Sequence, residues 1–142
     1  MTKKKETMPP KLGDGAIVHL TCQSTGQNLR IKPDGQIDGM GGNGKWAKFR
    51  VHRVSPGPAG TVMLQHFATP AYLRITPQGV LDGAGGGGPW CHFAIEQHGN
   101  GICSFRSVKG MGRIGMLPSG EAKLGAQTGQ GKHGQFLVTR IN

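Results

Sequence analysis

The chain carries the same hairpin-like stretch three times. Residues 28–39 read Asn-Leu-Arg-Ile-Lys-Pro-Asp-Gly-Gln-Ile-Asp-Gly, and residues 72–83 read Tyr-Leu-Arg-Ile-Thr-Pro-Gln-Gly-Val-Leu-Asp-Gly. A weaker third copy occupies residues 113–125. The turn glycines Gly35, Gly79 and Gly120 stand 44 and 41 residues apart. A repeat of this length constrains the fold strongly, because each copy forms the same unit and buries its apolar face against its neighbours.

The similarity continues downstream of each turn. A phenylalanine follows the turn glycine by 14 residues in the first two copies and by 16 in the third, at Phe49, Phe93 and Phe136. Three residues before each phenylalanine stand Trp46, Trp90 and His133. The third copy therefore contains a two-residue insertion. We predict one domain over residues 14–142, with repeats at about 15–57, 58–99 and 100–142, after a disordered basic arm at 1–13.

Apolar residues alternate with polar ones from Ile17 onward, which is typical of strands with one buried face. Each Pro-X-Gly triplet predicts a hairpin turn, because proline presets φ and glycine accepts a positive φ. The positions expected to form the core are Val18, Leu20, Leu29, Ile31, Ile37, Phe49, Val51, Val62, Leu64, Leu73, Ile75, Leu81, Phe93, Ile95, Cys103, Phe105, Ile114, Met116, Ala122, Phe136 and Val138.

The strand count per copy selects the architecture. Each copy supplies about four short strands, as a propeller blade does, but a propeller needs at least four blades. Three units that share one apolar core and leave no open edges form a closed barrel with pseudo-threefold symmetry. The sequence therefore predicts an all-β fold of the β-trefoil type.

Charge indicates the class of partner. The 142 residues contain 17 Lys and Arg against 7 Asp and Glu, for a net charge of +10. Such a balance favours a polyanion such as a sulfated glycan, although it also fits a role in solubility alone. No signal peptide and no membrane span are expected, which predicts a cytoplasmic protein or one secreted without a leader.

The titratable residues give no pattern of an enzyme. Cys22, Cys91 and Cys103 lie in strand-like runs and are expected to be buried free thiols. The six histidines lack metal-site spacing, so no metal or cofactor is expected. Asp38 and Asp82 occupy equivalent positions and are interpreted as turn residues. We therefore predict that the protein is not an enzyme. We also expect it to be a monomer.

The first repeat resembles the fibroblast growth factors. Leu20-Thr21-Cys22, followed by residues 29–39, is similar to that family's Leu-Tyr-Cys and Leu-Arg-Ile-x-Pro-Asp-Gly-x-Val-Asp-Gly. Residues 123–132 resemble the basic loop of its heparin-binding members, insertion included. The similarity covers roughly residues 15–140, and it implies a β-trefoil. Fascins and hisactophilin, which are cytosolic and bind actin, share this fold.

The resemblance implies two sites. A glycan site falls on Lys123, Lys132 and His133, with Gln127 in place of one of the family's basic residues. A receptor site falls on Asn100 and Val138, but Thr21 and Gly101 stand where the family has tyrosines. Aromatic residues carry much interface energy, so the resemblance predicts a weakened receptor surface.

A second basic stretch is read from the residues alone. With Phe49 and Val51 facing inward, Lys48, Arg50 and His52 lie on the outer face of one strand, about 7 Å apart. This row is either an anion site or an ordinary solvated face. Three functions thus remain open: a growth-factor-like module that binds heparan sulfate and a receptor, an actin-binding trefoil, or a lectin for small sugars.

Overall fold

The computed structural model describes residues 12–54 and 60–142. The first two repeats contain four strands each: β1 (Ile17–Cys22), β2 (Asn28–Ile31), β3 (Ile37–Gly41) and β4 (Phe49–Arg53), then β5 (Thr61–His66), β6 (Tyr72–Ile75), β7 (Leu81–Gly85) and β8 (Phe93–Gly99). The third repeat contains β9 (Ile102–Ser107) and β10 (Phe136–Arg140). The short 3-10 turns are η2 (Lys45–Ala47), η3 (Pro89–Cys91), η4 (Gly125–Gln127) and η5 (Lys132–Gly134).

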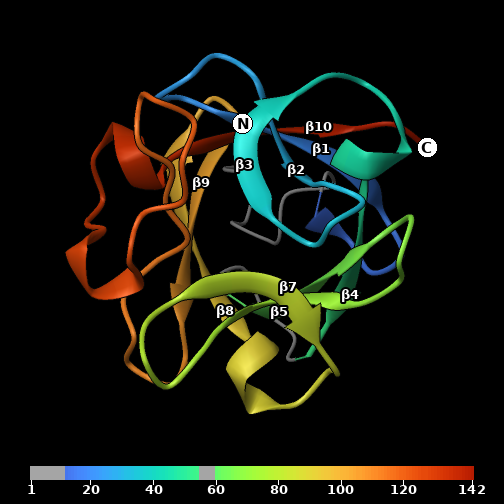
Figure 1. The fold of residues 1–142 in the computed structure, drawn as a ribbon. Helices are drawn as coiled ribbons and strands as arrows, with labels where there is room; N and C mark the ends of the chain where they lie inside the picture. Colours follow the sequence, from blue (N-terminus) through green and yellow to red (C-terminus); the bar gives the residue numbers. More distant parts are fainter. Residues whose placement is uncertain (1–11, 55–59) are drawn as a thin grey trace, which may run out of the picture.

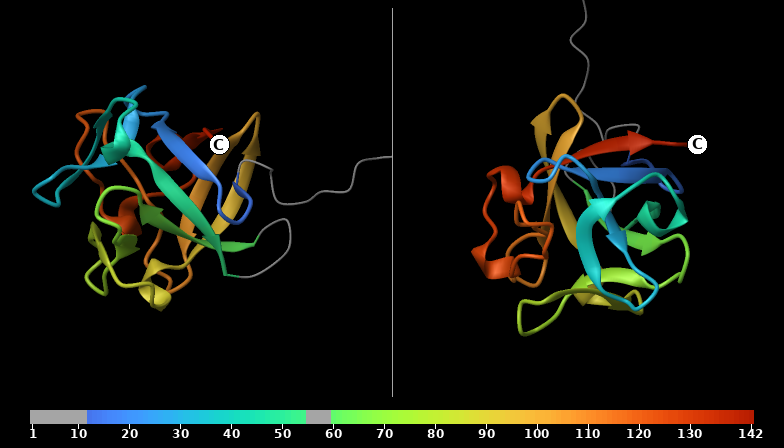
Figure 2. Two further views of the ribbon diagram at one scale, coloured as in Figure 1. Left: turned by 90° about the vertical axis from the view of Figure 1, so that its right-hand side faces the viewer. Right: turned by 45° about the horizontal axis from the view of Figure 1, so that its top comes forward.

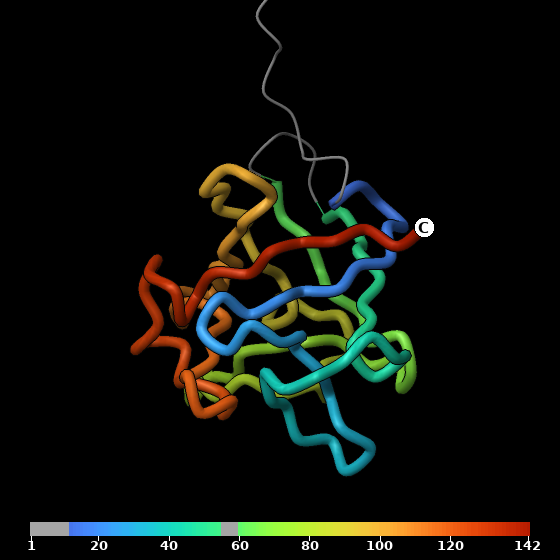
Figure 3. The backbone as a smooth tube through the Cα atoms, turned by 90° about the horizontal axis from the view of Figure 1, so that it is seen from above, coloured from blue at the N-terminus to red at the C-terminus, as the bar shows by residue number. Residues whose placement is uncertain are grey.

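Six of the strands close a barrel. β1 pairs with β4, β4 with β5, β5 with β8, β8 with β9, β9 with β10, and β10 returns to β1, all antiparallel. Figure 1 shows the assembly, and Figure 3 shows β10 running beside β1, which closes the ring. Closure removes the unpaired edges of the barrel. The all-β trefoil predicted from the repeats is confirmed.

The three repeated phenylalanines occupy equivalent places in this barrel. Each begins the last strand of its repeat and pairs with the first strand, at Val18–Phe49, Val62–Phe93 and Cys103–Phe136. All three phenylalanines are fully buried. The register therefore repeats with the sequence, and the rings share one core.

The predicted hairpin turns are present in all three copies. Gly35, Gly79 and Gly120 have φ of 89°, 81° and 96°. Each donates its N–H to the carbonyl three residues earlier, at 2.8 Å. This is a proline-initiated turn closed by a residue in the left-handed region, where glycine is the least strained choice.

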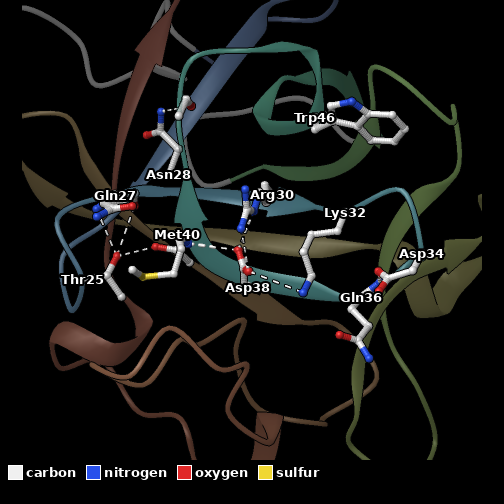
Figure 4. A network of polar contacts seen from close by, with 12 residues as sticks. Thr25, Gln27, Asn28, Arg30, Lys32, Asp34, Gln36, Asp38, Met40 and Trp46 are labelled. Carbon is white, nitrogen blue, oxygen red and sulfur yellow. Dashed lines mark hydrogen bonds and ion pairs between the residues drawn. The ribbon is translucent and has the colours of Figure 1, made fainter.

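Equivalent ion pairs brace the first two hairpins. Arg30 donates to both oxygens of Asp38 at 2.9 and 3.1 Å, and Arg74 does the same to Asp82 at 2.9 and 3.0 Å. Figure 4 shows the first pair between β2 and β3, with Lys32 close to the same carboxylate. Asp38 and Asp82 are therefore structural residues of the hairpins.

The third copy departs from the expected four strands. In place of a regular hairpin it has the isolated bridge Met116–Ala122. Gly115 and Lys123 stand where the other copies have the arginine and the aspartate. The bracing ion pair is therefore lost, and the segment is held by single hydrogen bonds such as Lys123 N–H to the Gly115 carbonyl, 2.9 Å.

The predicted core is buried except at two positions. Ile37 and Ala122 are only partly buried, although both pack against the core. Both follow a hairpin turn: Ile37 begins β3, and Ala122 pairs with Met116 in an isolated bridge. The structure also adds Leu12, Ala16 and Cys22 to the core.

Leu12 corrects the predicted arm. Its side chain is fully buried in the core, so the ordered domain begins before the boundary expected at residue 14. The alternation pattern missed it because Leu12 precedes the first strand. The rest of the predicted disordered arm, residues 1–11, lies outside the described residues.

The three cysteines are buried and free, as predicted. Burial raises the pKa of the Cys22 thiol from 9.0 to about 11. The unfolded thiol therefore ionises about two pH units before the folded one. Below pH 9 the thiol is neutral in both states, so its contribution to the free energy of unfolding is fully present. As pH rises from 9 to 11, only the unfolded thiol ionises, and the free energy of unfolding falls by about 2–3 kcal/mol.

Urea unfolding of the protein and of Cys22→Ala across pH 8–11 tests this prediction. Lysine titration is common to both proteins, so it cancels in the difference between their free energies of unfolding. We expect that difference to shrink by about 2–3 kcal/mol over this range. A difference independent of pH would contradict the buried, neutral thiol.

Candidate functional site

Basic side chains of the third repeat surround one hollow. It has a volume of about 260 Å³ and is lined by Lys123, Gly129, Gly131, Lys132, His133 and Gly134. Lys123 follows the third hairpin turn, and Lys132 and His133 belong to η5. Figure 2 shows this segment, coloured orange to red, as loops and short turns outside the strands of the barrel.

Backbone hydrogen bonds hold the two sides of the hollow together. Met116 donates its N–H to the carbonyl of His133 at 2.9 Å, which ties η5 to the third hairpin. The Lys123 ammonium donates to Nδ1 of His133, also at 2.9 Å. Because an ammonium only donates, Nδ1 accepts, and the ring proton lies on Nε2. The Lys123 ammonium is thus positioned at the hollow and keeps donors for a ligand.

Glycines shape the loop between η4 and η5. A Cβ at Gly129 or Gly131 would meet nothing within 4 Å, so both face open space. Gly134, in contrast, packs against the carbonyl of Gly129 and the methyl group of Thr128. Thr128 is buried and donates its hydroxyl to the Leu124 carbonyl at 2.9 Å. The inner part of the loop is therefore packed, and its outer part is open to a ligand.

The charge at the hollow is uncompensated within residues 12–54 and 60–142, where neither Lys123 nor Lys132 forms an ion pair with a carboxylate. Glu96 is engaged elsewhere: Arg113 donates to both its oxygens at 2.6 and 2.9 Å, and Arg106 lies 3.3 Å away. The Arg113 hydrogen bonds hold the Glu96 pKa below its usual range. Glu96 thus stays ionised and bound to arginines, and the lysines remain available to an external anion.

The structure separates the other predicted glycan residues from this hollow. Gln127 lies exposed on η4 and does not line it. Lys48 precedes β4 and Arg50 lies in it, and Figures 1 and 3 show β4 on the opposite side of the barrel from the third-repeat loops. The sequence grouped them by charge alone, whereas the pseudo-threefold arrangement places different repeats on different sides.

The predicted receptor residues differ in exposure. Asn100 is exposed in the β8–β9 turn, with a φ of 57° between Gly99 and Gly101, which also have positive φ. Val138 is only 1% exposed and packs in the core. Its assignment as a receptor contact is wrong, because its place on the inward face of β10 leaves no side-chain surface for a partner.

The family assignment rests on the whole trefoil. Residues 16–137 match the family model for fibroblast growth factor, which spans all three repeats. The chain belongs to the fibroblast growth factor family. A search of curated proteins gives no match. The resemblance to the fibroblast growth factors is thus confirmed at the level of the family.

Fibroblast growth factors form a non-enzymatic family. The structure describes residues 12–54 and 60–142 of this member. No group of three or more His, Cys, Asp or Glu there is placed to hold a metal ion. Across the same residues, no helix has the length and apolar character that crossing a bilayer requires. Within the described residues, the basic hollow brings together two lysines without carboxylate partners, and it is the candidate binding site of this fibroblast growth factor family member.

Proposed function

We propose that this trefoil is a non-enzymatic, growth-factor-like module that binds sulfated glycan, such as heparin or heparan sulfate, at the third-repeat hollow. The observation that supports it is the convergence of Lys123, Lys132 and His133 on one open hollow. Two lysines that have no carboxylate partner among the described residues present a positive potential to sulfate groups. The exposed backbone around Gly129 and Gly131 lets a polysaccharide approach closely.

Salt dependence distinguishes this binding from weak adsorption. When several lysines bind a polyanion, counterions are released. The logarithm of the affinity therefore falls linearly with the logarithm of salt concentration. In nucleic acids the slope of this line is roughly 0.7–0.9 per charge contact. We expect the protein to elute from a heparin column above physiological salt, about 0.15 M.

The double variant Lys123→Gln/Lys132→Gln tests the site. Removing two contacts should lower the slope of log affinity against log salt by about 1.5 and move elution to lower salt. The matched control Lys32→Gln/Lys109→Gln loses the same charge outside the hollow and should keep the slope of the unmodified protein. Release of the unmodified protein below physiological salt, or equal slopes for both variants, would contradict the proposal.

A protein receptor is the second partner that family membership supports. The exposed β8–β9 turn around Asn100 is the part of the predicted receptor surface that a partner can reach. Family membership also favours this module over the actin-binding and small-sugar alternatives. Co-sedimentation with actin filaments would favour the actin-binding alternative, and binding of neutral sugars on a glycan array would favour the lectin.

A further inference from the structure

The first repeat contains a counterpart of the third-repeat site. η2 and η5 occupy equivalent positions, and both begin after a glycine with nearly the same backbone angles: φ −82° and ψ −178° at Gly44, φ −77° and ψ −171° at Gly131. Lys45 therefore corresponds to Lys132, and Trp46 corresponds to His133. The same backbone frame presents a lysine and a ring in both repeats.

The first-repeat version combines two cations with two aromatic rings. The Lys45 ammonium lies 5.8 Å from the centre of the Trp46 ring, and the Lys48 ammonium lies 6.0 Å from the Phe67 ring. Phe67 is 43% exposed, and its N–H donates to the Lys48 carbonyl at 2.9 Å. Trp46 is half-buried, so both rings keep accessible surface beside an ammonium group.

A fully buried histidine fixes the tryptophan in place. His66 bonds through Nε2 to the Trp46 carbonyl at 2.9 Å and through Nδ1 to the Thr69 hydroxyl at 3.1 Å. Because a carbonyl only accepts, Nε2 carries the proton and donates. The His66 ring also packs against Trp46, with centroids 5.7 Å apart. The platform is thus held before any ligand arrives.

The loop that leads to this platform is anchored separately. The Asn28 amide donates to the Gly42 carbonyl at 2.8 Å, and the Thr21 hydroxyl donates to the Asn28 side-chain oxygen at 2.7 Å. Figure 4 shows the indole of Trp46 pointing away from the polar network of the β2–β3 hairpin. The indole therefore does not serve that network, and it is partly exposed to solvent.

Charge at this platform is uncompensated among the described residues. Lys45, Lys48 and Arg50 form no ion pair with any carboxylate there. The carboxylates of Asp38, Asp82 and Glu96 are instead bound to arginines of other elements. These three carboxylates therefore do not compete with an external anion for Lys45 and Lys48.

We propose that Lys45, Trp46, Lys48 and Phe67 form a second site for a sulfated saccharide, distinct from the third-repeat hollow. The aromatic faces pack against the C–H surface of a sugar ring, and the two ammonium groups bind its sulfates. The ligand class rests on the proposed function, because the same backbone frame carries the lysine and ring of the third-repeat site.

The second repeat lacks this combination. Pro89 stands in place of Lys45, and His92 stands in place of Lys48. Among the described residues, the ammonium that lies over the Trp90 ring is that of Lys109, at 5.2 Å, from the loop after β9. Two saccharide sites per protein are therefore expected, and a third is not.

Calorimetric titration with a heparin hexasaccharide tests the number of saccharide sites. The unmodified protein should bind two molecules. The first-repeat variant Lys45→Gln/Lys48→Gln and the third-repeat variant Lys123→Gln/Lys132→Gln should each bind one. Thermal unfolding of each variant checks that the fold is kept.

Tryptophan fluorescence locates the binding. The chain has two tryptophans, so Trp90→Phe leaves Trp46 as the reporter. We expect the hexasaccharide to change its emission in the Trp90→Phe protein and in the third-repeat variant on that background. The change should be lost in the first-repeat variant on the same background.

The outcomes separate this inference from the proposed function. One bound molecule that is lost only in the third-repeat variant overturns the second site and leaves the proposed function intact. One bound molecule that is lost only in the first-repeat variant supports the second site and overturns the proposed one. No binding overturns both. Stronger binding of single-stranded RNA or anionic lipid vesicles at Trp46 overturns the saccharide assignment.

Discussion

Replacing Phe136 by alanine is expected to lower the free energy of unfolding by about 3–5 kcal/mol. The ring is fully buried between β1 and β9, where Phe136 pairs with Cys22 and Cys103, and its centroid lies 6.2 Å from that of Phe105. Removing it leaves a cavity that a closed barrel cannot readily collapse. A loss of this size is a large part of the roughly 5–15 kcal/mol that stabilises a typical domain.

Phe67→Ala is the matched control, since it removes the same side chain at a position that is 43% exposed. Its cost should stay below about 1 kcal/mol, as for most surface substitutions. Urea unfolding monitored by circular dichroism measures both. If Phe136→Ala does not fold, Phe136→Leu should still cost about 1–2 kcal/mol. Equal losses at positions 136 and 67 would contradict the shared core.

Gly112→Ala should be nearly as damaging, at about 2–5 kcal/mol. Gly112 has a φ of 82°, where a Cβ costs about 1–2 kcal/mol. A Cβ there would also overlap the carbonyl group of Gly125. The backbone of the third repeat must move to relieve that overlap, at a further cost of about 1–3 kcal/mol. Thermal or urea unfolding of the variant measures the sum.

Gly110→Ala separates the two contributions. Gly110 has a similar φ of 77°, but a Cβ there would meet nothing within 4 Å. Its substitution should therefore cost only the conformational part, about 1–2 kcal/mol. If the two alanine variants were equally stable, the close approach between Gly112 and Gly125 would be refuted.

Most of the fold could be predicted because the same strand and turn patterns occur in each of the three copies. The spacing of Phe49, Phe93 and Phe136 placed them in one core, and the Pro-X-Gly triplets placed the turns. Leu12 was missed because it lies before the first alternating run. A regular hairpin was wrongly predicted in the third repeat. The sequence there resembles the other two copies, but it lacks the Arg–Asp pair that braces their hairpins.

The candidate sites were predicted less completely. Lys123, Lys132 and His133 were predicted as one group because they fall in one basic loop, and the structure places them around one hollow. The support of Trp46 by His66 was missed, because residues 20 positions apart pair only when β4 and β5 are side by side. The equivalence of Lys45 to Lys132 was a signal in the sequence that could have indicated the second site.

The sequence by itself determined the module: alternating apolar residues and turn glycines act over a few neighbours, so each copy specifies its own hairpin. Only the tertiary structure decided which charges share a surface, since closing the barrel turns each repeat to a different side. That closure places Lys48 on the opposite side of the barrel from Lys123 and His133 (Figures 1 and 3), and it buries Val138. Local rules thus formed the units, and the geometry of their assembly placed the sites.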